Sequence, residues 1–322
     1  MFSIQKKKEA GFEKVILKND VTNNYAAVVP ACGAILQEFV VEQNNQKVNV
    51  IDSYHSLEEF KNEVTKGFKG CKLSPFVCRL THGKYIFGEK QYQVQKHYMG
   101  QHAIHGLLYD KDFSIISETA NAAEASITMK YEYRADDPGY PFNYDCIVTW
   151  RLEPENKLTV ITECINQDEG LIPMQDGWHP YFTLGDTIND LDLEFQGKQM
   201  VEFDTELLPT GNLVDYTRFS GIEKLGDRFL DNCFTLDTQE CQPLCVLRNK
   251  EKKIEIQFFP DESYPYLQIY TPPHRKSIAI ENLSGAPDGF NNEMGVITLE
   301  SGQSALFSTT YKILLLDKFK LK

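Results

Sequence analysis

Two residues far apart in the chain have the types and settings that acid–base chemistry needs. Glu281 follows the apolar run 278–280, where partial burial would raise the pKa of a carboxyl group toward a neutral working pH and suit it to act as a general base. His179 lies in an aromatic stretch, and histidine changes its charge most readily near neutral pH. Each could be structural when taken alone. Together they could remove a proton from one substrate oxygen and deliver a proton to another.

Three further polar side chains, Arg79, His105 and Asp231, lie inside strand-like or turn-like stretches. A polar group in such a place needs a partner or a role, because burying it without a hydrogen bond costs free energy. His102 and His105 are three residues apart, and on a strand their side chains would diverge, so a metal pair is not expected there. Gly106 permits a turn or a close backbone approach directly after His105.

Side-chain alternation along strands predicts where His179 points. In the segment 178–184, Trp178, Phe182 and Leu184 share one face, whereas His179 and Tyr181 share the other. Three large apolar side chains would bury the first face in a core. His179 and Tyr181 would then project into an open groove.

The same alternation applies to Glu281 and Arg79. Ile278 and Ile280 would face the core, and Glu281 would face away from it. Around Arg79, alternation puts Cys78 on the core side and the guanidinium on the opposite side, toward solvent or a cleft. The elements that carry the chemistry are therefore expected to be strands with one buried face.

Short apolar runs rich in β-branched and aromatic residues recur along the whole chain, for example at 127–133, 146–152 and 305–316. Gly, Pro, Asn and Asp separate them, which is typical of strands and turns. One helix is expected after Ser56, where a capping box precedes Phe60 and Val64. No linker or repeat divides the sequence. We therefore predict one domain, residues 1–322, with an all-β fold: a large antiparallel β-sandwich with at most one or two short helices.

Composition narrows the classes of partner. The 322 residues are 42% hydrophobic and carry a formal net charge of −13, which disfavours nucleic acid and anionic membranes as partners. No run approaches the ~18 apolar residues of a membrane span, and no apolar run follows the basic residues near Met1, so a cytoplasmic location without a signal peptide is expected. The eight cysteines form no Cys-x-x-Cys pair and are interpreted as reduced thiols.

Six motifs, taken in order, resemble the aldose 1-epimerase (mutarotase) family from about Gly70 onward. They are Pro75–Gly83 with Arg79, Ile104-His105-Gly106, Tyr140-Pro141-Phe142, Gly177–Phe182 with His179, Leu230–Phe234 with Asp231, and Ile278–Glu281. The resemblance implies a large β-sandwich, called a supersandwich in the galactose mutarotase-like proteins, whose concave face binds a free aldose and interconverts its α and β anomers.

Carried over residue by residue, the resemblance implies that Glu281 is the general base and His179 the general acid. It implies that His105 binds near the ring oxygen, and that Arg79 and Asp231 bind sugar hydroxyls. Two departures indicate a divergent subgroup and leave galactose preference open: Leu107 follows His105-Gly106, and Trp178 precedes the catalytic histidine. Some relatives act on hexose 6-phosphates, for which Lys72, Arg275 or Lys276 could serve.

In the implied mechanism the carboxylate of Glu281 removes the C1 hydroxyl proton while the imidazolium of His179 protonates the ring oxygen. The ring opens to an aldehyde and closes on the other face, so no metal or other cofactor is needed. Three alternatives remain. Asp231 and Glu281 could be the carboxylate pair of a glycoside hydrolase. The chain could be a non-catalytic carbohydrate-binding protein. His105, His179 and Glu281 could bind a metal, although their spacing does not favour it.

Overall fold

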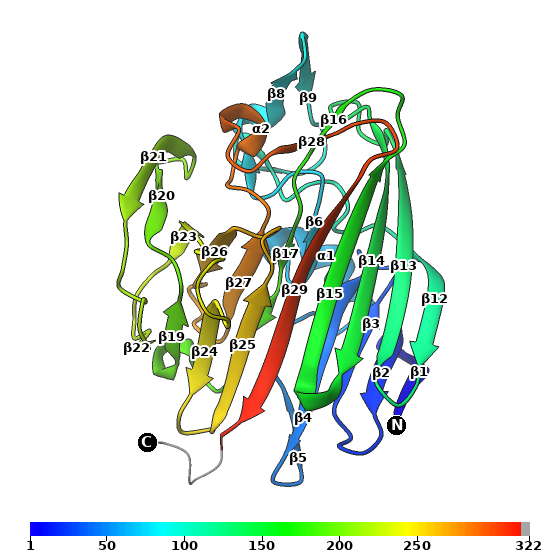
Figure 1. Cartoon of the computed structure of the whole chain (residues 1–322), viewed down its shortest axis with the longest axis vertical. Coiled ribbons are helices and arrows are strands. Elements are labelled where there is room, and N and C mark those ends of the chain that lie inside the picture. Colours follow the sequence, from blue (N-terminus) through cyan, green and yellow to red (C-terminus); the bar gives the residue numbers. More distant parts are fainter. Residues whose placement is uncertain (317–322) are drawn as a thin grey trace.

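Antiparallel strands build most of the chain in the computed structural model, which describes residues 1–316 (Figure 1). The largest sheet has nine strands, and its long central strands come from the apolar runs noted above. In spatial order they are β12 (Ser114–Ala120), β13 (Ala125–Arg134), β14 (Asn143–Glu153), β15 (Lys157–Asn166), β29 (Ser304–Leu315), β25 (Ile254–Pro260), β24 (Cys245–Asn249), β19 (Asp192–Phe195) and β22 (Glu223–Lys224).

An eight-stranded sheet carries most of the predicted site residues. In spatial order its strands are β21 (Pro209–Asp215), β20 (Gln199–Phe203), β23 (Asp231–Thr235), β26 (Tyr266–Tyr270), β27 (Ile278–Leu283), β17 (Gly177–His179) and β6 (Cys71–Leu73), with β18 (Tyr181–Phe182) also paired to β27. All of these pairings are antiparallel. Residues distant in sequence therefore meet side by side on neighbouring strands.

A five-stranded sheet from the N-terminal part and several small sheets complete the structure. The five strands are β1 (Phe2–Glu9), β2 (Phe12–Asn19), β3 (Tyr25–Val29), β4 (Ile35–Gln43) and β5 (Gln46–Asn49). The small sheets use β10 (Tyr98–Met99), β11 (His102–Ile104) and β7 (Arg79–Leu80), then β8 (Lys84–Phe87) and β9 (Lys90–Gln93), then β16 (Ile172–Met174) and β28 (Ile297–Leu299).

The main core lies between the nine-stranded sheet and the other two large sheets (Figure 1). Trp150 on β14 meets Trp178 on β17 with ring centroids 5.3 Å apart. Phe182 on β18 packs against Phe258 of β25 at 5.0 Å and Tyr311 of β29 at 5.5 Å. Burial of such large side chains supplies the main stabilisation of a sandwich. The prediction of an antiparallel all-β sandwich is therefore confirmed.

Two α-helices occur among residues 1–316, α1 (Leu57–Gly67) and α2 (Gly289–Asn292). The helix predicted after Ser56 is α1, and Phe60 and Val64 form its buried face. The Ser56 hydroxyl accepts a hydrogen bond of 3.1 Å from the Glu59 backbone N–H, as an N-cap should. The Glu59 carboxylate accepts from the His55 N–H at 2.6 Å, so the reciprocal bond reaches one residue beyond the cap.

Replacing Ser56 by alanine is expected to lower the free energy of unfolding by about 1 kcal/mol, because the Glu59 N–H loses its acceptor. Urea denaturation of both proteins measures the change. The matched control is Ser301→Ala in an exposed turn, for which a change near zero is expected. An S56A variant as stable as the parent would contradict a capping role for this hydroxyl.

Candidate active site

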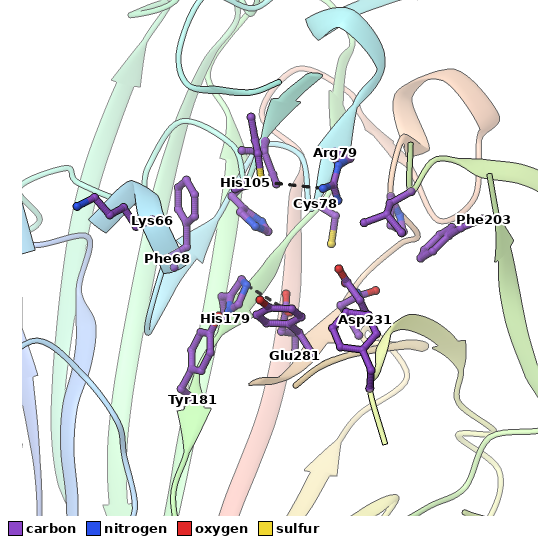
Figure 2. Close-up of a pocket in the computed structure, with 18 of the residues that line it drawn as sticks. Lys66, Phe68, Cys78, Arg79, His105, His179, Tyr181, Phe203, Asp231 and Glu281 are labelled. Carbon is purple, nitrogen blue, oxygen red and sulfur yellow. Dashed lines mark hydrogen bonds and ion pairs between the residues drawn. The ribbon is translucent and has the colours of Figure 1, made fainter. Parts of the chain in front are cut away.

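A cavity of about 380 Å³ opens beside β17, β27, β23 and β26, and all five predicted site residues line it (Figure 2). They are Arg79, His105, His179, Asp231 and Glu281. Aromatic and apolar side chains, among them Phe68, Tyr181, Phe203, Phe229 and Tyr270, supply much of the remaining wall. A concave, largely apolar site with a few convergent polar groups is typical of small-molecule binding.

His179 and Glu281 meet on adjacent strands at the buried end of this cavity. β17 pairs with β27 at Gly177 and Leu283, and the antiparallel register brings His179 opposite Glu281 two residues further on. Nε2 of His179 lies 3.4 Å from Oε1 of Glu281, and their side chains are 7% and 1% exposed. The predicted alternation is confirmed, because Trp178 and Ile280 belong to the core while His179 and Glu281 line the cavity.

His105 forms the next part of the wall, directly after β11. Its ring packs edge-on against the His179 ring at 4.9 Å and tilts over Phe68 at 4.6 Å. The His105 backbone N–H donates to the Cys78 carbonyl at 2.9 Å. Gly106 has φ +71°, and a Cβ there would lie 2.4 Å from the Ser74 carbonyl oxygen, so both predicted reasons for this glycine hold.

Arg79 begins β7 and lines the cavity, as does Cys78 directly before it. The core-side prediction for Cys78 is confirmed, because the residue is buried in a small core cluster with Leu73, Val77 and Leu283. Cys78 has φ +49°, which turns the chain just before β7 and interrupts strict alternation, so this residue borders the cavity as well as the core. Arg79 makes a 3.9 Å contact from its guanidinium to the Met99 sulfur.

Asp231 is joined by Gln268, a residue that the sequence analysis missed. Nε2 of Gln268 donates to Oδ1 of Asp231 at 2.9 Å. Gln268 lies between its neighbours on the sheet, pairing with Cys233 on β23 and with Glu281 on β27. Gln268 alternates with Leu267 and Ile269, both fully buried, and this alternation places the Gln268 side chain on the cavity face of β26.

Burial shifts the pKa values of His179 and Glu281 in the directions that favour the neutral form of each side chain. Desolvation lowers the pKa of His179 to about 4 and, together with the charge of Asp231, raises the pKa of Glu281 well above its ordinary value. Desolvation also lowers the pKa of His105 and raises that of Asp231, although Arg79 opposes the latter shift. In the free protein, burial therefore favours the protonated form of Glu281 beside a neutral His179.

Several polar atoms in this wall have no hydrogen-bond partner within the protein. Of the seven such buried side-chain atoms among the described residues, four line the cavity: Nδ1 of His105, Nδ1 of His179, Oε1 of Gln268 and Oε2 of Glu281. Buried polar atoms are nearly always satisfied. Their concentration here indicates a site for a polar ligand.

Two of the basic residues that could have bound a substrate phosphate, Lys72 and Arg275, make contacts within the protein instead. Nζ of Lys72 forms a fully buried ion pair with Asp176 and lies 4.7 Å from the Trp178 ring centroid. Arg275 donates to the Asn189 side chain and to two backbone carbonyls. Lys276 is exposed and borders a different cavity. None of the three lines the cavity that holds Glu281.

His102 and His105 diverge as predicted. Nε2 of His102 contacts Oε2 of Glu206 at 3.2 Å, and its Nδ1 accepts from the His82 N–H, outside the cavity lining. Within residues 1–316 no three His, Cys, Asp or Glu side chains are grouped as metal ligands. No helix in that range is long and apolar enough to cross a membrane.

Comparisons with known proteins identify a family and several relatives. The family model described as Aldose 1-epimerase matches residues 13–312. The aldose 1-epimerase of Streptococcus thermophilus is 23% identical over 337 aligned residues, which cover 92% of this chain and 94% of the relative. The uncharacterized protein YihR of Escherichia coli K12 is 25% identical over 243 residues, which cover 73% and 75% of the two chains.

A solved structure supports the same fold. A galactose mutarotase-like protein from Clostridium acetobutylicum superposes with a TM-score of 0.87 at 16% sequence identity, covering 98% of this chain and 99% of the other. At this identity the likeness shows the fold alone. It agrees with the supersandwich that the motifs implied.

Proposed function

The chain belongs to the aldose 1-epimerase family, and we propose that it interconverts the α and β anomers of a free hexose or related aldose, with Glu281 and His179 moving the protons. Members of this family are isomerases, and the substrate is a sugar. The observation that carries the proposed mechanism is the 3.4 Å approach of His179 Nε2 to Glu281 Oε1 at the end of a cavity lined by all five predicted residues.

The close approach of His179 and Glu281 suits a substrate with a hemiacetal group. The hydroxyl oxygen and the ring oxygen of a hemiacetal are bonded to the same carbon, so the base that acts on one and the acid that acts on the other must lie near each other. Glu281 takes the proton from the C1 hydroxyl, the C1–ring oxygen bond breaks to leave the aldehyde, and His179 gives a proton to the ring oxygen. Rotation about C1–C2 and the reverse transfers then close the ring on its other face.

One proton on the pair is sufficient for this cycle. Burial favours that proton on Glu281 in the free protein, whereas the reaction begins from carboxylate and imidazolium. Transfer of the proton across the 3.4 Å contact converts one form into the other without exchange with solvent. The newly formed charges are stabilised when the sugar's hydroxyl and ring oxygen become their partners.

The remaining groups hold the sugar. Arg79 and Asp231 bind hydroxyl groups away from C1, and His105 lies next to His179 near the ring oxygen. Gln268 keeps a free acceptor after donating to Asp231, so it can accept from a further hydroxyl. Each such bond is worth about 1 kcal/mol, more when one partner is charged.

Anomer exchange measured by NMR or polarimetry across a panel of aldoses and their 6-phosphates tests the proposal. Accelerated exchange of at least one free aldose is expected. A glycoside hydrolase would instead release reducing ends from a disaccharide, and a non-catalytic binding protein would retain sugar without accelerating exchange. Either of these results in place of exchange would refute the proposed function.

The pH dependence of kcat/KM is expected to be bell-shaped, with its acid limb near pH 4 rather than near 6.5. Below the acid limb the pair holds two protons and offers no base. Above the raised pKa of Glu281 the pair holds no proton and offers no acid. Initial rates measured across the pH range in which the protein stays folded check this, and an acid limb at the ordinary histidine pKa would contradict it.

A further inference from the structure

A second groove, of about 340 Å³, adjoins the cavity that holds Glu281. The two share five lining residues: Lys66, Gly67, Tyr181, Tyr270 and Pro273. Figure 2 shows Lys66 and Phe68 on the His105 and His179 side of the cavity, across from Phe203 and Asp231. The space available to a ligand therefore continues from the acid–base pair toward α1.

The helix α1 supplies the polar wall of this groove. Glu59, Glu63 and Lys66 follow one another at i, i+4 and i+7 and all line it, whereas Phe60 and Val64 face the core. His274 completes the polar lining. Tyr270 contributes an aromatic ring, which favours contact with the apolar face of a sugar.

The bonding of a pyranose decides which of its substituents points toward this groove. With C1 at Glu281 and the ring oxygen at His179, C5 lies on the far side of the ring oxygen from C1, and C5 carries C6. Beyond His179 the cavity wall continues through His105 and Phe68 to Lys66, because His105 packs against both His179 and Phe68. A group attached to C6 would therefore leave the cavity on the Lys66 side.

The charges of the groove fit a neutral polyol rather than an anion. Nζ of Lys66 lies 2.6 Å from Oε2 of Glu63, and Nζ of Lys69 lies 2.8 Å from Oδ1 of Asp52. Both lysines of the groove are thus already paired, and Glu59 adds a further carboxylate to the wall. Carboxylates and paired ammonium groups can exchange hydrogen bonds with hydroxyls, whereas a phosphate would be repelled by the acidic groups.

We propose that the preferred substrate is a reducing disaccharide joined through C6 of the epimerised ring, with the second ring seated between α1 and Tyr270. This inference rests on the proposed function, because that function sets the direction in which C6 points. Glu63 and His274 line the groove and not the cavity that holds Glu281. They would bind the second ring without touching the first.

Anomer-exchange kinetics with melibiose (1→6 linked), maltose (1→4 linked), glucose and glucose 6-phosphate test the inference, because all four have glucose as the ring that opens. Melibiose is expected to have a KM about tenfold below that of glucose, as one or two added hydrogen bonds to charged groups would give. The Glu63→Ala/His274→Ala double variant should remove that advantage and leave glucose kinetics unchanged. Glu58→Ala, an exposed position on the same helix outside the groove, is the matched control and should change neither sugar.

Three results would overturn the inference: equal KM values for melibiose and glucose, a preference for maltose or glucose 6-phosphate, or a double variant indistinguishable from the parent. Calorimetric binding of melibiose and glucose to the same proteins separates the two proposals. If no sugar undergoes exchange, the proposed function fails, yet tenfold tighter binding of melibiose that depends on Glu63 and His274 would still support the groove. If glucose exchanges and the double variant changes nothing, the proposed function alone survives.

Discussion

Replacing Glu281 by glutamine is expected to lower kcat for anomer exchange by at least about 10², because the amide has the shape of the carboxyl group but cannot take the C1 proton. The substituted side chain would remain beside His179, which now lies 3.4 Å from Oε1 of Glu281. Binding should change much less than turnover, since the lost interaction is made mainly in the transition state. Single-sugar kinetics give kcat and KM separately. A variant with near-parental kcat on every active sugar would exclude Glu281 as the base.

The same variant should be more stable than the parent at neutral pH, which excludes unfolding as the cause of lost activity. Glu281 has a folded-state pKa raised by burial, whereas its carboxyl in the unfolded chain titrates near 4.5. As pH rises through 4.5 the unfolded state loses this proton and the folded state keeps it, so the parent loses stability. Glutamine removes that loss. The gain in Tm should therefore be small near pH 4 and larger near pH 8.

Asp231→Asn is the matched control for removal of a carboxylate from the same cavity. If Asp231 only binds a hydroxyl, KM should rise while kcat changes less than in Glu281→Gln. Loss of the Asp231 charge also removes one cause of the raised Glu281 pKa, so the alkaline limb of the pH profile should move to lower pH. A glycoside hydrolase using both carboxylates would instead be equally damaged by either substitution and would release reducing ends.

Replacing His179 by glutamine is expected to lower kcat by about 10²–10⁴, because the ring oxygen loses its proton donor during opening. The acid limb near pH 4, which belongs to the pair, should also be lost in this variant. Initial-rate measurements over pH, with circular dichroism to check folding, test both expectations.

Tyr181→Phe is the matched control for His179. The Tyr181 ring stacks on the His179 ring at 5.1 Å and 12°, and phenylalanine preserves that stacking, so kcat should change only slightly. If His179→Gln instead kept parental turnover, the acid would have to be another group. His105, whose ring centroid lies 4.9 Å from that of His179, would then be the next residue to replace by mutation.

The direction of the key side chains follows from local sequence alone. Large apolar neighbours such as Trp178 and Ile280 must be buried, and because strand side chains alternate, His179 and Glu281 must then face the other way. The helix α1 could likewise be predicted from local sequence, since Ser56 marks its start and the spacing of Phe60 and Val64 marks its buried face. Where the backbone leaves the extended conformation, as at Cys78, alternation no longer separates the two faces, and the residue borders both the core and the cavity.

Only the tertiary structure decided which of these side chains meet and what their surroundings do to them. The 3.4 Å contact between His179 and Glu281 depends on the register of two strands about a hundred residues apart, which no local pattern specifies. Burial, also a property of the whole fold, lowers the pKa of His179 and raises that of Glu281, so both side chains favour their neutral forms. It likewise hides Lys72 in an ion pair with Asp176, where the sequence had left it free to bind phosphate. The kinds of group available for sugar chemistry were thus set by sequence, and their distances and charges by packing.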